Sequence, residues 1–136
     1  MSRPLAPLLQ LVRQGAVFGA VGLAATLTHV LIALALEGLA GVEALLANLI
    51  GYTCGIGVSY LGHARLTFGA PSRNAAQFAR FLAVTFFGLG LNQLIVWVCV
   101  HRIGWPFWAA LVAVVLLVPG PTFVLAKLWA FRRPSA

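Results

Sequence analysis

Long apolar runs alternate along this chain with short breaks that contain polar residues, glycine or proline. Four runs are long enough to cross a bilayer as helices, which takes about 20 mostly apolar residues. These runs cover residues 15–36, 44–61, 81–100 and 107–126. The segments between them are short, and residues 38–43, 69–77 and 101–106 are predicted turns. The pattern therefore predicts an all-α membrane protein with four transmembrane helices.

Residues 1–14 differ from the four spans. Leu5, Leu8, Leu9 and Val12 follow helical spacing, which predicts a short helix on the cytoplasmic surface of the membrane. Disorder near the terminus is the alternative. We therefore divide the chain into an interfacial segment, 1–14, and one four-helix transmembrane domain, 15–133. The first span is too long for the core of a cleaved signal peptide, so we expect it to remain.

The composition excludes an ordinary soluble domain. Hydrophobic residues make up 62% of the chain and charged residues only 8%, whereas soluble domains have about 25% charged residues. The mean hydropathy of +1.01 agrees. The chain has no Asp, and its two acidic residues are Glu37 and Glu43. Because the sequence offers no paired carboxylates, nucleophile triad or metal-binding spacing, we expect neither an enzyme nor a bound cofactor.

Positive charge is divided unequally between the two sides of the predicted membrane domain. Arg102 lies in an outer turn, on the side that also holds both glutamates. The other eight Lys and Arg residues fall on the opposite side: Arg3, Arg13, Arg65, Arg73, Arg80, Lys127, Arg132 and Arg133. Because cytoplasmic segments carry the excess of Lys and Arg, both termini are predicted to be cytoplasmic.

The two halves of the chain resemble each other. Residues 18–68 align without gaps with residues 81–131, and Gly41 falls on Gly104. Each half contains a helix, a turn, a second helix and a basic exit, which predicts two repeated hairpins. Both hairpins would enter from the cytoplasmic side. The repeats are therefore predicted to be parallel, related by an axis along the membrane normal.

Three segments resemble the GtrA-like family of small four-span membrane proteins. They are Ala47-Asn48 after the first outer turn, residues 59–68 at the end of span two and residues 121–131 at the end of span four. In this family each hairpin ends in an Asn or Ser, an aromatic residue, a basic residue and a final Phe. The resemblance covers about residues 13–133. One departure is that Ala64 occupies the basic position of the first hairpin, with Arg65 following it.

The resemblance implies that the protein moves a polyprenyl-phosphate-linked monosaccharide to the outer leaflet of the bacterial cytoplasmic (inner) membrane. There a second enzyme would use the sugar to modify a cell-envelope glycan. The implied partners are this lipid-linked sugar and membrane lipid, and no nucleic acid. An accessory or scaffold subunit of a membrane glycosyltransferase is one alternative. A small multidrug exporter is another, although Glu37 is poorly placed for proton exchange. Because four helices are few to enclose a translocation path, we expect a homodimer.

Polar side chains inside the spans are candidates for function, because burying them in hydrocarbon is costly. They follow helical spacing in the first three spans, and one more lies near the end of the fourth. Either they bond between packed helices, or they line a path for the sugar. The candidates for this path are His29, Asn48, Asn92, Gln93, Tyr52, Ser59 and Thr122.

Three basic or titratable residues lie where spans two and four reach the cytoplasmic side. Lys127, Arg65 and His63 are candidates for binding the lipid phosphate, and simple snorkelling of cations to the surface is the alternative. Nearby, the Pro-Gly-Pro sequence at 119–121 predicts a break in span four, and residues 55–57 form a weak point at the same place in span two. Paired interruptions indicate a transport site, and a simple proline kink is the alternative.

Overall fold

The computed structural model describes residues 5–62, 75–125 and 128–129. In these ranges the chain is helical apart from short connections. Helix α1 spans Leu5–Ala40 and α2 spans Ala44–Gly62. Helix α3 spans Ala75–Trp97 and continues as a π-helix, η2, over Val98–Ile103. Helices α4 and α5 span Phe107–Leu117 and Pro119–Leu125.

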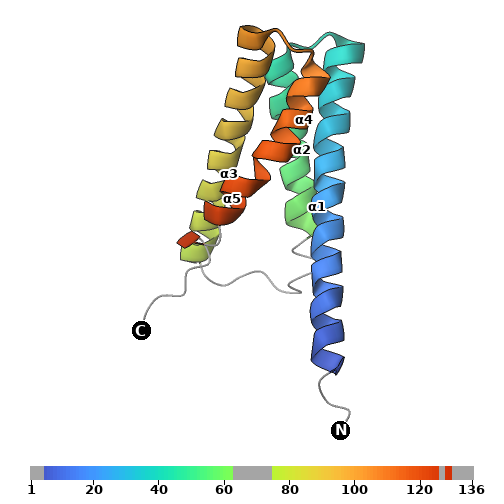
Figure 1. The fold of residues 1–136 in the computed structure, drawn as a ribbon, viewed down its shortest axis with the longest axis vertical. Coiled ribbons are helices and arrows are strands. Elements are labelled where there is room, and N and C mark those ends of the chain that lie inside the picture. The colour runs from blue at the N-terminus through green and yellow to red at the C-terminus, as the bar shows by residue number, and fades with distance from the viewer. Residues whose placement is uncertain (1–4, 63–74, 126–127, 130–136) are drawn as a thin grey trace.

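The helices form two hairpins whose connections lie at the same end of the bundle (Figure 1). Residues 41–43 join α1 to α2, and residues 104–106 join η2 to α4. We call this end the tip end. Glu43 and His101 link the two connections there, with Glu43 Oε1 3.6 Å from His101 Nε2. The other carboxylate oxygen of Glu43 accepts bonds from the backbone N–H groups of Leu45 and Leu46, so it caps α2.

The lengths and hydropathies of the helices are those of a membrane protein. Within the described ranges, three helices are long and apolar enough to cross a membrane: Ala6–Ala40, Ala44–Gly62 and Leu82–Ile103. The apolar stretch Phe107–Thr122 is shorter. Many large apolar side chains are exposed on the bundle, among them Leu23, Leu31 and Leu116, and in a bilayer they would face lipid. The chain is thus an all-helical membrane protein, as predicted.

Both tip connections are shorter than the predicted turns. Residues 38–40 and 101–103 are helical, so the turns that we expected to begin at 38 and 101 begin at Gly41 and Gly104. Each of these glycines has a positive φ, 66° and 80° respectively, which favours glycine. The next N–H group in each hairpin bonds back into the helix, from Val42 to the Leu36 carbonyl at 3.0 Å and from Trp105 to the Cys99 carbonyl at 2.8 Å.

The predicted interruptions of spans two and four have different outcomes. The break in span four is confirmed, because α4 ends at Leu117 and α5 begins at Pro119. The weak point in span two is wrong, because α2 is continuous through residues 55–57. The glycine at position 55 instead allows close packing, since a Cβ there would lie 2.8 Å from the Ala25 carbonyl oxygen of α1. The interruptions are therefore not paired.

The buried core lies toward the tip end and draws on both hairpins. Ala33 of α1, Ala47 of α2 and Val96 of α3 are fully buried, and they cluster with buried side chains of α4. The α4 members are Phe107, Leu111 and Val114, with Val118 just beyond the end of that helix. This cluster closes the bundle at its tip end.

Helix α1 extends beyond the other helices at the end opposite the tip (Figure 1). Its 36 residues correspond to about 54 Å of helix, against about 30 Å for the hydrocarbon core. Residues 5–14 are the first part of this continuous helix. Their placement on the cytoplasmic surface of the membrane stays a prediction.

Candidate functional site

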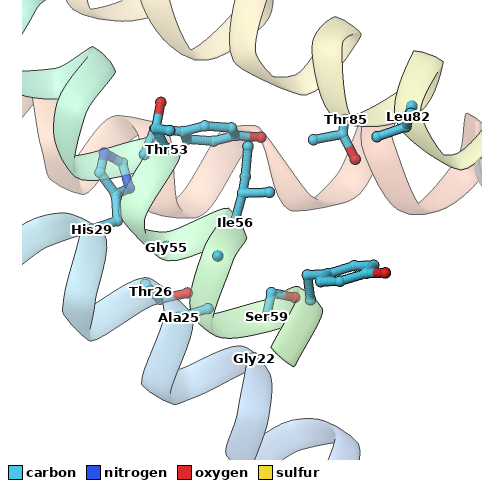
Figure 2. A pocket seen from close by; sticks show the side chains of 13 residues that line it. Gly22, Ala25, Thr26, His29, Thr53, Gly55, Ile56, Ser59, Leu82 and Thr85 are labelled. Atoms are coloured by element: carbon cyan, nitrogen blue, oxygen red, sulfur yellow. The ribbon is translucent and has the colours of Figure 1, made fainter. Parts of the chain in front are cut away.

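A groove opens between α1, α2 and α3 in the part of the bundle away from the tip (Figure 2). Its volume is about 670 Å³, within the range of small-molecule sites. It is lined by Gly22, Ala25, Thr26 and His29 of α1, by Tyr52, Thr53, Gly55, Ile56, Gly57, Ser59 and Tyr60 of α2, and by Leu82 and Thr85 of α3. These residues lie where α2 ends and α3 begins, so the groove faces the end at which the two hairpins are joined along the chain.

The lining of the groove is uncharged and mostly apolar, with a few hydrogen-bonding groups. Threonine, serine and tyrosine hydroxyls from all three helices contribute, together with the imidazole of His29. None of the described lining residues is Lys, Arg, Asp or Glu. Figure 2 shows His29 and Thr53 at one end of the lining and Leu82 and Thr85 at the other. Most of the exposed lining is apolar, and the hydroxyls and the imidazole are its few polar groups, so the groove can offer a neutral ligand a small number of hydrogen bonds.

Close packing of α1 on α2 places His29 at the groove. A Cβ at Gly51 would lie 2.6 Å from the His29 carbonyl oxygen, and one at Gly55 would lie 3.2 Å from the His29 Cβ. These two glycines and Ala47 recur one turn apart, which lets the two backbones approach each other. The ring of His29 also meets the ring of Tyr52 edge to face, with centroids 5.5 Å apart.

Four polar side chains, three of them buried and one half-buried, form a cluster that joins the first three helices. We call His29, Asn48, Asn92 and Gln93 the polar cluster. Asn48 Oδ1 lies 2.9 Å from His29 Nε2, and Asn48 Nδ2 donates to Asn92 Oδ1 at 2.6 Å and to Gln93 Oε1 at 2.5 Å. Gln93 Nε2 donates to the Leu45 carbonyl at 3.1 Å. Asn48 therefore uses its amide oxygen and both amide hydrogens across helix interfaces.

Asn92 is incompletely satisfied in this cluster. Its Oδ1 accepts from Asn48, while its Nδ2 is the one buried side-chain polar atom without a hydrogen bond within the described part of the chain. The residue is only 1% exposed, so it has no direct access to the groove. An unmet buried donor is costly, by about 1–3 kcal/mol.

The structure divides the residues that the sequence predicted for a sugar path. His29, Tyr52 and Ser59 line the groove. Asn48, Asn92 and Gln93 do not line it and bond between helices, which is the packing alternative. Thr122 of α5 bonds the backbone at the break before its helix, donating to the Val118 carbonyl at 2.7 Å. The predicted phosphate-binding residues Lys127, Arg65 and His63 lie outside the described residues.

Several lining residues were not predicted from the sequence. Thr26 and Thr85 contribute hydroxyl groups from α1 and α3, and Thr53 and Tyr60 from α2. A signal existed for Thr26 and Thr85, because each lies on the same helical stripe as a polar-cluster residue, three residues before His29 and seven before Asn92. Tyr60 carried no such signal, because it is one position from the polar face of span two.

One wall of the groove depends on Tyr52. A Cβ at Gly88 of α3 would lie 2.8 Å from the Tyr52 hydroxyl oxygen and 3.0 Å from Thr122 Cγ2. Three helices therefore meet at this glycine, α2, α3 and α5. Only a residue without a side chain fits there while Tyr52 stays in its place.

The family of the chain follows from comparison with known proteins. The family model described as GtrA/DPMS, transmembrane domain, matches residues 17–131. The chain belongs to this family. Neither the curated proteins nor the solved structures contain a match. Family membership associates the chain with the handling of polyprenyl-phosphate-linked sugars and confirms the family resemblance predicted from the sequence.

Proposed function

We propose that this protein translocates a polyprenyl-phosphate-linked monosaccharide across the membrane. The observation that carries the proposal is the uncharged groove, mostly apolar but with several hydroxyl groups, between three membrane-spanning helices of a GtrA/DPMS-family chain. The groove can hold a sugar headgroup by hydrogen bonds while the apolar lipid tail stays in the bilayer. This shielding lowers the cost of carrying polar hydroxyl groups through hydrocarbon.

In this proposal both termini face the cytoplasm of a bacterial cell, and the tip end faces outward. The excess of Lys and Arg away from the tip supports this orientation. The groove then lies toward the cytoplasmic side, where a newly made lipid-linked sugar would enter. The core cluster and the Glu43–His101 contact close the outer side.

The phosphate of the lipid binds at Lys127, Arg65 and His63 in this proposal. The support is positional: α2 ends at Gly62, next in sequence to His63, and the groove reaches Tyr60. A monosaccharide in the groove would thus have its phosphate near the end of α2. Cations on two equivalent helix ends would hold it by charge-assisted hydrogen bonds.

The two hairpins are parallel repeats in this proposal. Equivalent positions support the assignment: α1 and η2 end at Ala40 and Ile103, and α2 and α4 begin at Ala44 and Phe107. The glycines with positive φ and the hydrogen bonds behind them are also equivalent. Burial agrees as well, because His29 and Asn92 are both buried and Ala47 and Ala110 are both fully buried.

Two copies of the chain form the working unit in this proposal. The support is the small size of a four-helix bundle and the open face of α1, where Cβ atoms at Gly15 and Gly19 would meet nothing within 4 Å. Small residues at this spacing allow close helix contacts.

A pair of threonines on α1 tests the proposal. Thr26 lines the groove, whereas Thr28 does not, and its hydroxyl bonds the Ala24 carbonyl at 2.8 Å. Thr26→Val removes a hydroxyl with little change of shape and should slow flipping of a polyprenyl-phosphate hexose in liposomes by about three- to tenfold. Thr28→Val should leave the rate unchanged.

The same assay separates the proposal from an accessory role. A scaffold subunit of a glycosyltransferase would give no flipping by the purified protein, and neither threonine would then matter. Equal rates for the two variants, or a wild-type rate no higher than that of protein-free liposomes, would contradict translocation through this groove.

A further inference from the structure

A chain of hydrogen bonds runs from a backbone carbonyl into the groove. It begins at the Leu45 carbonyl, which accepts from Gln93 Nε2 at 3.1 Å. Gln93 Oε1 accepts from Asn48 Nδ2, and Asn48 Oδ1 faces His29 Nε2 at 2.9 Å. His29 is the last member of this chain and the one that lines the groove.

The first bond fixes the direction of all the others. A backbone carbonyl only accepts, so the part of the Gln93 amide that faces Leu45 must be the nitrogen. The Gln93 amide oxygen then faces Asn48 and can only accept, so the Asn48 amide nitrogen must be the donor. The bond from Asn48 Nδ2 to Asn92 Oδ1 uses the second hydrogen of the same nitrogen. Asn48 therefore turns its oxygen to His29, and Nε2 of His29 must carry a hydrogen.

The imidazole of His29 is neutral in this setting. Its partner Asn48 is uncharged, and no carboxylate contacts the ring within the described residues. A buried cation without a counter-ion inside a membrane span is strongly disfavoured. A neutral ring with its hydrogen on Nε2 has a bare Nδ1, which can only accept a hydrogen bond.

The Nδ1 atom of His29 makes no hydrogen bond to a described residue. It is not among the fully buried unpartnered atoms of the described chain, although the residue as a whole is only 6% exposed. Since the residue lines the groove, that acceptor is available to a ligand there. The hydroxyls of Thr26 and Ser59 can donate or accept and so do not distinguish between ligand groups.

We infer that His29 is a specificity-determining residue, held by Leu45, Gln93 and Asn48 so that its Nδ1 accepts a hydrogen bond from a ligand hydroxyl. The inference rests on the proposed function and specifies its substrate class further. A sugar with a free hydroxyl at the matching ring position would bind. One with a carboxylate, an ether or a hydrogen there would bind more weakly, because none of these groups can donate a hydrogen bond.

Two substitutions of His29 separate the role of Nδ1 in binding a ligand from the role of Nε2 in bonding Asn48. Glutamine keeps an amide nitrogen for Asn48 but loses the acceptor at Nδ1, whereas asparagine keeps an oxygen near Nδ1 but cannot reach Asn48. We expect His29→Gln to keep the wild-type melting temperature and bind a polyprenyl-phosphate hexose about five- to tenfold more weakly. His29→Asn should bind more tightly than His29→Gln and melt at a lower temperature. Wild-type binding by His29→Gln would overturn the inference.

Modified sugars identify the hydroxyl that donates. The probes are polyprenyl-phosphate hexoses in which one hydroxyl at a time is replaced by hydrogen or by fluorine. At one ring position both replacements should weaken binding to the wild type by a similar factor and leave binding to His29→Gln unchanged. If no position is coupled to His29 in this way, the inference is overturned.

The position of the hydrogen on His29 can be measured without a ligand. In protein labelled with ¹⁵N-histidine, the His29 signals are those missing from His29→Gln, and their pattern distinguishes the two neutral forms. We expect the hydrogen on Nε2, and a hydrogen on Nδ1 would overturn the inference. Failure of the proposed function has a different signature: wild-type protein that neither binds nor flips the hexose probe.

Discussion

At the residue scale, Asn48 makes the most polar contacts between the helices. It bonds His29 of α1 and both Asn92 and Gln93 of α3. It is fully buried, so the groups that it bonds would not find water as a replacement partner at its position. Asn92, in contrast, makes one of these bonds and leaves its own Nδ2 without a partner.

Substitution of the two asparagines should therefore have unequal effects. Asn48→Leu strands one polar atom each of the buried His29 and Asn92 and of the half-buried Gln93, and it should lower the free energy of unfolding by about 2–4 kcal/mol. Asn92→Leu strands one hydrogen of Asn48 but also removes the unmet Nδ2, and should cost about 1 kcal/mol. Unfolding in detergent measures both values. A larger loss for Asn92→Leu than for Asn48→Leu would contradict the hydrogen-bond pattern.

The sequence located these residues but could not assign their partners. Helical spacing places Asn48, Tyr52 and Ser59 on one face of span two, and the structure keeps them on the inner side of the bundle. Which of them meets a neighbouring helix depends on the register between helices, and spacing within one helix does not contain that information. The hydroxyl of Thr122 similarly donates to the Val118 carbonyl beside the proline break. This local bond competes with a bond from the same hydroxyl to another helix or to a ligand.

At the element scale, hydropathy predicted the order of the apolar helices. Of the four predicted spans, the described residues contain three helices of spanning length and a shorter apolar stretch divided between α4 and α5. Helix α3 also begins at Ala75, inside the predicted turn 69–77. Two further errors lie at glycines. Gly38 was taken as the start of a turn, but it is helical, and the turn begins at Gly41. Residues 55–57 were taken as a weak point, but α2 is continuous there. Sequence does not distinguish a glycine that ends a helix from one that lets two helices touch.

Two glycines of α2 provide a matched test of this close packing. A Cβ at Gly55 would press on the Ala25 backbone, whereas one at Gly57 would meet nothing within 4 Å. Gly55→Ala should lower the free energy of unfolding by about 1–3 kcal/mol through overpacking. Gly57→Ala should leave it unchanged or raise it by up to about 1 kcal/mol, because alanine favours the helix. Equal effects on the melting temperature would contradict the α1–α2 contact.

At the scale of the whole molecule, the bundle is closed at one end and grooved at the other. The core cluster and the contact between Glu43 and His101 join the hairpins at the tip end. The groove lies toward the opposite end. With the proposed orientation this is a form open to the cytoplasm. Translocation then requires a second form in which the tip contacts separate, and the lipid shifts the balance only by binding the two forms unequally.

The phosphate site belongs to this scale because its proposed members come from both hairpins. Lys127→Ala should weaken binding of the polyprenyl-phosphate sugar by about tenfold, the loss of one charge-assisted hydrogen bond. Arg73→Ala removes the same charge from the same predicted side and serves as the control, with little expected change. Binding to lipid nanodiscs measures both. Equal weakening would indicate diffuse surface charge in place of a phosphate site.

The central claim is that this chain alone moves a lipid-linked sugar across a bilayer. The most direct measurement reconstitutes the purified wild-type protein into liposomes that contain a polyprenyl-phosphate hexose in both leaflets. An impermeant reagent that oxidises sugars is then added outside. The account predicts that nearly all the sugar reacts when protein is present and about half when it is absent, because flipping brings inner-leaflet lipid to the reagent. Reaction that stops at the same fraction with and without protein would contradict it.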